Sequence, residues 1–182
     1  MTVEPRTDDD ELLHCIVEIP KGSRNKYEWD ERLGAIKLDR FLFSSLVYPT
    51  DYGYIPKTLS DDGDALDVMV IVSEATFPGC VILVKPIALF KMRDEEGEDM
   101  KLLCVPITDP NWNHFETLED VPDQLCDEIE WFFSMYKNPE GKKVEVDGWA
   151  SKEEAWKALE ESRDRWCEHD EERKGEEDAA QG

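Results

Sequence analysis

Residues 66–72 read LDVMVIV and residues 81–90 read VILVKPIALF. Short, near-continuous apolar runs of this kind are typical of strands buried on both faces. The segment 101–105 (KLLCV) returns after a turn marked by Gly97, which predicts a hairpin with the second run. The sequence therefore predicts a buried sheet built from the middle of the chain.

Further short strands are expected on the N-terminal side of these runs, where Gly and Pro residues punctuate the chain. Turn-forming residues at such intervals bound strands in all-β regions. The expected segments are residues 12–20 (LLHCIVEIP), 25–29 (NKYEW), 35–38 and 48–55.

Helical patterns come late in the chain. Pro122 begins a segment whose apolar residues Leu125, Ile129, Phe132 and Tyr136 follow one helical stripe. A second helix is expected after residue 151, where the capping-box pattern of Ser151 and Glu154 precedes Trp156 and Leu159. Strands first and helices last predict an α+β domain that is mainly β: a small barrel with two C-terminal helices packed outside.

The chain has 182 residues, which suits one domain. We expect an acidic leader over residues 1–11, a single domain over 12–167, and an acidic, disordered tail over 168–182. The formal net charge of −23 repels nucleic acid phosphates and anionic membranes, so neither is an expected partner.

The cellular compartment is predicted from the absence of a signal peptide, a membrane-spanning segment and a disulfide pattern. The N-terminus is polar, and no apolar run approaches the length of a membrane span. The five cysteines lie at positions 15, 80, 104, 126 and 167 without a CxxC spacing, which favours buried reduced thiols. Together these features predict a cytoplasmic protein. The three histidines show no zinc pattern.

The strongest local signal is the segment DGDALDV, residues 62–68. It places Asp62, Asp64 and Asp67 within six residues, on a Gly-containing loop that leads into a buried strand. In an extended segment Asp62 and Asp64 project to the same side. Crowded carboxylates repel one another unless cations lie between them, and hard oxygen ligands select Mg²⁺ or Mn²⁺.

Two other interpretations of this loop compete with a metal site. A DGD triplet alone is most often a solvated turn. An EF-hand loop would need Gly at its sixth position, Glu at its twelfth and a helix afterwards. No alignment of this segment places both residues correctly, and a strand is expected after it instead of a helix.

A second acidic cluster, residues 94–101 (DEEGEDMK), lies at the expected hairpin turn. Asp94 and Asp99 flank the turn and are predicted to face each other across it. Lys101 follows Asp99 by two residues, hence on the same strand face. The glutamates between them are interpreted as an ordinary acidic hairpin tip.

Cationic and phenolic side chains accompany the carboxylates. Each has an alternative structural explanation as a surface ion pair, a core residue or a solvated charge. A phosphate anion among metal ions nevertheless needs this mixture of groups. The candidates are Lys26 with Glu28, Arg40, Tyr48, Tyr52, Tyr136 and Lys137.

These segments together resemble the soluble family I inorganic pyrophosphatases over roughly residues 15–149. The resemblance rests on VEIPKGSRNKYEWD, LDRFLFSSLVYPTDYGYIPKTLSDDGDALDV, FKMRDEEGEDMKLLCVP and FFSMYK. The family pattern DGDPxDV has Pro where this chain has Ala65, which implies a slightly softer loop. The resemblance implies a closed, OB-like five-stranded barrel, Mg²⁺-dependent hydrolysis of pyrophosphate to two orthophosphates, and a homohexamer.

The resemblance also implies a role for each site residue. Asp62, Asp67 and Asp99 would hold two Mg²⁺ ions that activate a water for in-line attack, and Asp64 would be its general base. Asp94, with Asp99, would bind a further Mg²⁺ that arrives with substrate, and Glu18 would orient another through water. Glu28 would organise the lysines and Tyr52 a metal-coordinated water. The phosphate contacts would come from Lys26, Arg40, Tyr48, Lys101, Tyr136 and Lys137.

Three alternative functions are weighed against this one. A non-catalytic cation- or phosphate-binding protein would not need both a general base and a full set of cations. The second is a broader phosphohydrolase that acts on nucleotides or polyphosphate; no P-loop or Gly-rich fingerprint is present, which argues against nucleotides. A structural protein is disfavoured because nothing in the sequence repeats.

Overall fold

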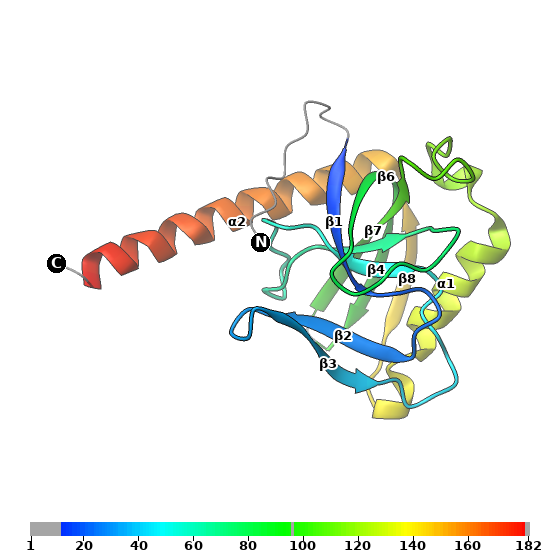
Figure 1. Ribbon diagram of the computed structural model, residues 1–182, viewed down its shortest axis with the longest axis horizontal. Coiled ribbons are helices and arrows are strands. Elements are labelled where there is room, and N and C mark those ends of the chain that lie inside the picture. Colours follow the sequence, from blue (N-terminus) through cyan, green and yellow to red (C-terminus); the bar gives the residue numbers. More distant parts are fainter. Residues whose placement is uncertain (1–11, 96, 181–182) are drawn as a thin grey trace.

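A computed structural model describes residues 12–95 and 97–180 of the chain, and the expected acidic leader 1–11 lies outside them. Within that range the element order is mainly strands followed by helices (Figure 1). The elements are β1 (Leu13–Ile19), β2 (Asn25–Asp30), β3 (Ala35–Phe41), β4 (Asp51–Tyr54), β5 (Asp67–Val70), β6 (Val81–Asp94), β7 (Gly97–Pro106), η1 (Leu118–Asp120), α1 (Asp123–Met135), η2 (Asn138–Glu140), β8 (Glu145–Ala150) and α2 (Lys152–Ala180).

Five strands close into a ring. Their order is β1-β4-β5-β7-β6, and β6 returns to pair with β1. All of these pairings are antiparallel except that of β5 with β7. The ring is not formally a barrel, but it confirms the predicted closed five-stranded arrangement. Closure gives each of the five strands a partner on both sides, which reduces the exposed edges that favour aggregation.

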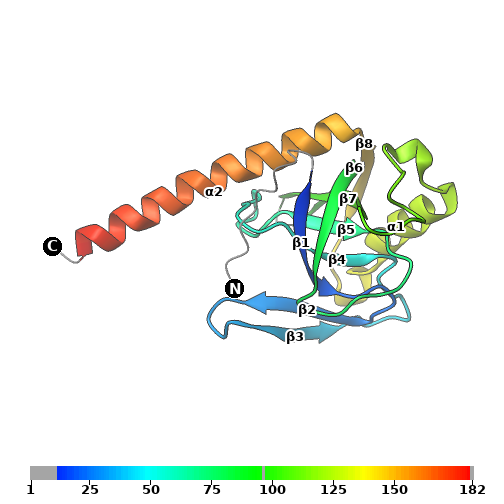
Figure 2. The same cartoon turned by 45° about the horizontal axis from the view of Figure 1, so that its top comes forward.

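Two elements extend this ring. The long strand β6 pairs through residues 89–93 with β8. Strands β2 and β3 form a separate hairpin that lies on the side of the ring opposite α2 (Figure 2). The sequence did not reveal β8 because its segment, EVDGWA, is polar and contains Gly148 in a left-handed conformation (φ 99°). The seven other strands lie where the sequence predicted them.

Alternation along the strands divides the core into two clusters. Residues such as Met69, Phe90 and Leu103 pack against α1, whereas Val68, Val70 and Leu102 pack on the side of α2. This alternation follows from the two-residue period of a strand. Because both strand faces are covered, the runs that carry them are apolar almost throughout.

Helix α2 begins as the sequence predicted. The Ser151 hydroxyl accepts a hydrogen bond from the Glu154 N–H at 3.4 Å, and the Glu154 carboxylate accepts one from the Ser151 N–H at 3.4 Å. This is a capping box, which satisfies two N–H groups at the start of the helix. The helix continues past Cys167 to Ala180 and extends beyond the body of the molecule (Figure 1). Residues 168–180 are thus helical, where the sequence had indicated a disordered tail.

The cysteines of the described chain are all free, as expected. Cys15 and Cys104 are buried, but Cys80 and Cys126 are only partly so and Cys167 is exposed. The expectation of buried thiols therefore holds for the strand cysteines and not for the one on α2. No helix in the described range combines the length and the apolar character that a membrane crossing requires.

Candidate functional site

The candidate site is centred on the ammonium group of Lys101. The parallel pairing of β5 with β7 makes Asp67 and Lys101 register partners, and Asp99 lies two residues earlier on β7. Lys101 Nζ lies 2.8 Å from Asp67 Oδ2 and 2.5 Å from Asp99 Oδ1, while its side chain is only 1% exposed. Strand register therefore places one cation between two carboxylates.

The charges of this group perturb one another. Burial alone would lower the pKa of Lys101, but Asp67 and Asp99 outweigh it and raise that pKa above its ordinary value. Burial raises the pKa of Asp99, with Lys101 opposing the shift and Asp67 adding to it. The ammonium is thus held in its charged form by two carboxylates that would otherwise repel each other.

Three tyrosines lie beside this group. Tyr52 donates its hydroxyl hydrogen to Asp67 Oδ2, and its ring centroid lies 5.4 Å from that of Tyr48. Tyr136, at the end of α1, stacks on Phe132, which also contacts Tyr48. Burial raises the pKa of all three phenols, so they remain neutral hydrogen-bond donors at physiological pH.

A second buried ion pair joins Asp94 at the end of β6 to Lys137 after α1. Lys137 Nζ lies 2.5 Å from Asp94 Oδ2, with 14% and 5% of the two side chains exposed. Burial raises the pKa of Asp99 and the charge of Lys137 partly opposes that rise, so this pair adjoins the Lys101 group. The sequence had suggested that Asp94 and Asp99 face each other across the hairpin, but in the structure they do not. The register pairs Asp94 with Gly97 and Asp99 with Met92, and each carboxylate takes its own lysine.

The β2–β3 hairpin supplies the next group of charges. Lys26 and Arg40 are register partners, and Lys26 pairs with Glu28 on its own strand. Arg40 donates from Nε to Glu140 Oε1 at 3.0 Å and pairs with Asp39. The hairpin register therefore sets two cations side by side.

Glu18 connects β1 to this hairpin. Its Oε1 accepts a hydrogen bond from the Trp29 N–H at 2.7 Å. Burial raises the pKa of Glu18 to about 7, with the charges of Asp67 and Glu28 adding to the shift and Lys26 opposing it. A carboxyl group so perturbed is one that gains from an added cation.

The DGDALD loop lies between β4 and β5 and stays open to solvent at Asp62 and Asp64. The segment is not extended, because Asp62 Oδ1 accepts a hydrogen bond from the Asp64 N–H at 3.0 Å and closes a turn. Partial desolvation, then the charges of Asp62 and Asp67, raise the pKa of Asp64. The loop thus adds two exposed carboxylates to the half-buried one of Asp67 on β5.

The structure therefore gathers the predicted residues through a chain of contacts and electrostatic interactions that includes each of the fourteen. Every one takes part in a contact or interaction given above. In the described part of the chain, however, no three His, Cys, Asp or Glu side chains already stand together as a metal-binding group. The physical reason is that Lys101 lies between Asp67 and Asp99, while Asp62 and Asp64 lie on an exposed loop. The donors themselves are carboxylate oxygens, the type that fits Mg²⁺.

Two acidic residues of this region were missed from the sequence. Asp39 pairs with Arg40 and lies 3.7 Å from Lys26, and Glu140 pairs with Arg40 from the 3-10 turn η2. Asp39 had a local signal, since it directly precedes Arg40. Glu140 had none, because a hundred residues separate it from its partner.

Comparison with known proteins identifies the family of this chain. The sequence profile of the inorganic pyrophosphatase family matches residues 15–167. The chain belongs to the inorganic pyrophosphatase family. Membership places it among the hydrolases with inorganic pyrophosphatase activity (EC 3.6.1.1).

Relatives in this family match most of the chain. The inorganic pyrophosphatase of Methanosarcina acetivorans is 57% identical over 153 residues, which cover 84% of this chain and 91% of the relative. That of Haloferax volcanii is 47% identical over 165 residues, 90% of this chain and 92% of the relative. Both pairs share nearly their full length.

Solved structures show the same pyrophosphatase fold. The inorganic pyrophosphatase of Thermus thermophilus has a TM-score of 0.86 at 39% identity and covers 91% of this chain and 97% of its own. That of Helicobacter pylori has a TM-score of 0.87 at 35% identity, covering 91% and 99%. The five-strand ring with two helices is therefore the fold of the family.

Proposed function

We propose that this protein hydrolyses pyrophosphate to two orthophosphates by in-line attack of water, with Mg²⁺ as its cofactor and Mn²⁺ as a possible substitute. The observation that carries the proposal is the mixture of charges around Lys101. Carboxylates and ammonium groups from five separate strands and one helix end converge there, and buried phenols lie among them. A polyanionic substrate bound with cations needs this combination of groups.

The carboxylates divide into a half-buried and an exposed set. Asp67 and Asp99 lie beside Lys101, while Asp62 and Asp64 stand on the loop at the rim. We assign Asp62, Asp67 and Asp99 as ligands of two Mg²⁺ ions. Asp94 would bind a further Mg²⁺ together with Asp99, and Glu18 would orient another through water. Bound Mg²⁺ would neutralise substrate charge and lower the pKa of a water toward neutrality.

Asp64 is the proposed general base. Its carboxylate is open to solvent, and its raised pKa favours acceptance of a proton from the attacking water. Lys101 forms its ion pairs with Asp67 and Asp99 and not with Asp64, so the carboxylate oxygens of Asp64 are available for this step. Tyr52 is proposed to orient the water through the hydroxyl that it now donates to Asp67.

The cations are assigned to the phosphoryl oxygens. Lys26 and Arg40 approach from the hairpin, and Lys101 and Lys137 from the ring and the end of α1. The phenols of Tyr48 and Tyr136 add directional hydrogen bonds, while Glu28 keeps Lys26 in place through their ion pair. These groups stabilise charge as it moves to the leaving phosphate, which is the main source of catalysis in phosphoryl transfer.

Release of phosphate from pyrophosphate, with and without Mg²⁺, is the first test. ATP and tripolyphosphate serve as competing substrates. Fast Mg²⁺-dependent release confined to pyrophosphate is expected. Folded protein that releases no phosphate with any divalent metal would instead indicate a non-catalytic binder.

Asp64→Asn tests the base assignment. General base catalysis contributes about 10²–10⁴-fold, so kcat should fall by that factor while Mg²⁺ binding is retained. Asp127→Asn, an exposed residue on α1, is the matched control and should leave kcat unchanged. Near-normal turnover in Asp64→Asn would remove Asp64 from this role.

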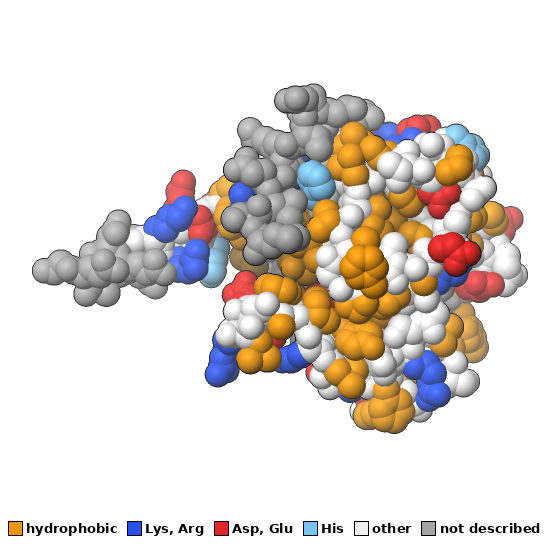
Figure 3. All heavy atoms as spheres, in the orientation of Figure 1, with side chains coloured by type: hydrophobic (Ala, Val, Ile, Leu, Met, Phe, Trp, Pro, Cys, Tyr) orange, Lys and Arg blue, Asp and Glu red, His pale blue; other side chains and the backbone are white. Residues whose placement is uncertain are grey.

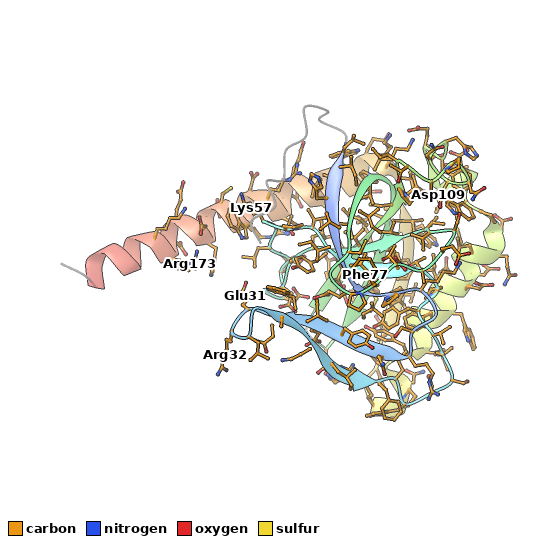
Figure 4. The ribbon with its side chains drawn as sticks, viewed as in Figure 1. Glu31, Arg32, Lys57, Phe77, Asp109 and Arg173 are labelled. Carbon is orange, nitrogen blue, oxygen red and sulfur yellow. The ribbon has the colours of Figure 1, made fainter. Side chains whose placement is uncertain are left out.

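Assembly and location are proposed on separate grounds. We expect a homo-oligomer, a hexamer by resemblance, and a cytoplasmic location. Large apolar side chains are exposed, among them Phe77 at 64% and Trp131 at 62%. Hydrophobic side chains gather across the face of Figure 3, where Figure 4 labels Phe77. Light scattering after gel filtration tests the subunit number, and a monomer would contradict the proposal.

A further inference from the structure

The loop that carries Asp62 and Asp64 has few restraints of its own. Inside it, the Ser60 N–H donates to Asp64 O at 2.7 Å and the Gly63 N–H to Ser60 O at 3.1 Å. Residues 61–64 are exposed and make no contribution to either core cluster. Residue 65 is Ala, so the backbone there lacks the restraint that a proline ring would give. The Asp64 N–H also donates to Asp62 Oδ1 at 3.0 Å, and the Leu66 N–H donates to the buried Thr58 Oγ1 at 2.9 Å. Further restraint on residues 59–64 must come from elsewhere in the fold.

Helix α2 supplies such a restraint. Its residues Ala158 and Leu159 belong to one core cluster, whereas Tyr52 and Phe133, the rings beside Lys101 Nζ, belong to the other. Both backbone groups of Leu59 are bonded to α2: its N–H donates to Ser162 O at 2.8 Å, and its carbonyl accepts from Arg165 Nε at 2.8 Å. A second nitrogen of Arg165 donates to Ser162 Oγ at 3.1 Å, and a third lies 3.5 Å from Asp61 Oδ1. The planar fork of one guanidinium thus ties three points together.

This contact is rigid at its helix end. Ser162 is fully buried, and its hydroxyl donates to Ala158 O at 2.8 Å. Ala158 and Leu159 of the same helix segment belong to the core cluster that packs on the ring. Arg165 therefore joins the exposed loop to a part of α2 that the core holds in place.

We propose that Arg165 is a positioning residue for divalent-cation binding: it fixes the loop of Asp62 and Asp64 from behind without touching the cation. A loop that is already ordered loses less conformational entropy when its carboxylates bind an ion. Residues that support metal ligands in this indirect way typically change metal affinity by about 10–100-fold when mutated. The inference rests on the proposed metal-binding role of this loop.

The test is a Mg²⁺ titration of the substrate-free protein by calorimetry, together with the Mg²⁺ concentration for half-maximal hydrolysis. For Arg165→Ala we expect the dissociation constant for Mg²⁺ to rise about tenfold. Arg165→Lys keeps the charge but not the fork, so its dissociation constant should fall between those of the wild type and Arg165→Ala. KM for pyrophosphate at saturating Mg²⁺ should change little, since Arg165 contacts no proposed phosphate ligand.

Arg173→Ala is the matched control on the same helix. Arg173 lies on the part of α2 that extends beyond the body (Figure 4), and one of its nitrogens lies 2.9 Å from Asp170 of the same helix. The variant removes an arginine and its surface ion pair with Asp170, and its Mg²⁺ affinity should stay within about twofold of the wild type. A tenfold loss in this control would overturn the inference, because it would show an effect of helix charge alone.

Two outcomes separate this inference from the proposed function. If Asp62→Asn weakens Mg²⁺ binding and both Arg165 variants leave it unchanged, the inference is wrong while the metal loop stands. If Asp62→Asn itself leaves Mg²⁺ binding unchanged, the metal assignment of the loop fails and the inference fails with it.

A purely structural role for Arg165 is also distinguishable. It would lower the melting temperature without changing the Mg²⁺ dissociation constant, and this result would overturn the inference. In the Asp62→Asn background the effect of Arg165→Ala should shrink to less than about threefold, since coupled residues are non-additive. If Arg165→Ala does not fold, Arg165→Lys carries the same comparisons.

Discussion

Replacement of Lys101 by Met tests whether a buried ammonium holds two carboxylates together. Met fills much of the volume of the lysine stem, so no large cavity is left. The charge is lost, and with it the contacts of the ammonium with the Tyr52 and Phe133 rings. Asp67 and Asp99 are then left near each other without the cation that both now contact. The change is therefore mainly electrostatic.

The expected magnitude follows from the burial of the three partners. Removing one member of a buried ion pair lowers the free energy of unfolding by about 3–5 kcal/mol, because the remaining charge is uncompensated. Asp67 and Asp99 keep 30% and 16% exposure, so they retain part of their hydration. We therefore expect the lower end, about 3 kcal/mol in EDTA, or a fall in Tm of about 6–12 °C for a chain of this size.

Urea unfolding followed by tryptophan fluorescence measures this loss. Added Mg²⁺ should then stabilise Lys101→Met more than the wild type, because a divalent cation replaces the missing ammonium. Ligand linkage gives about 2.7 kcal/mol at a hundred times the dissociation constant, which would recover most of the loss.

Lys91→Met is the matched control. Lys91 is 39% exposed and forms a surface pair with Glu154 at 3.0 Å, so its loss should lower the free energy of unfolding by no more than about 1 kcal/mol. A Lys101→Met protein as stable in EDTA as this control would refute the reasoning. Equal stabilisation of Lys101→Met and wild type by Mg²⁺ would do the same.

Three further predictions concern Glu18, Gly53 and the end of α2. Burial raises the pKa of Glu18 to about 7 from 4.5, so the folded protein in EDTA retains a proton that the unfolded chain releases, and this contribution to stability is lost as pH rises across that range. Urea midpoints of Glu18→Gln should lose this slope, and an unchanged slope would exclude Glu18 as its source. A Cβ at Gly53 would lie 1.9 Å from Ile16 O, so Gly53→Ala should lower the free energy of unfolding by about 3 kcal/mol, and a wild-type urea midpoint would contradict this. Deletion of residues 168–182 leaves the contacts of Arg165 in place, so the Mg²⁺ dependence of hydrolysis should stay within about twofold in the same phosphate-release assay; a larger change would show that the projecting helix supports the site.

The sequence predicted best those features that depend on local pattern. Residues 66–72 and 81–90 are apolar because both faces of β5 and β6 are covered. A continuous apolar run is visible in the sequence even when the partner strands are unknown. The capping box of Ser151 and Glu154 is equally local. Such features need only a few neighbouring residues, so a single sequence contains them.

Features that depend on distant partners were missed or misjudged. Strand β8 is polar and exists because β6 offers it an edge, with Trp149 opposite Phe90. The pairing of Glu140 with Arg40 spans a hundred residues and has no local trace. Asp94 and Asp99 were expected to face each other, but the hairpin register that separates them is set by the sheet as a whole.

Helix α2 shows the same limit in another way. Its acidic end resembled a disordered tail, since residues 168–178 are strongly charged. Ion pairs within the helix, such as Lys174 with Asp170 at 2.5 Å, provide local support that composition alone does not reveal.

Ring closure has a consequence for the protein during its synthesis. Strand β1 cannot complete its pairing until β6 has been synthesised. Lys137 of the candidate site is synthesised later still, after α1. At about 5–20 residues per second, the first strand waits several seconds for its last partner. Non-local pairings also slow folding itself. No N-terminal fragment that ends before Lys137 contains the assembled site, so turnover measured during translation would report only chains that extend past this residue.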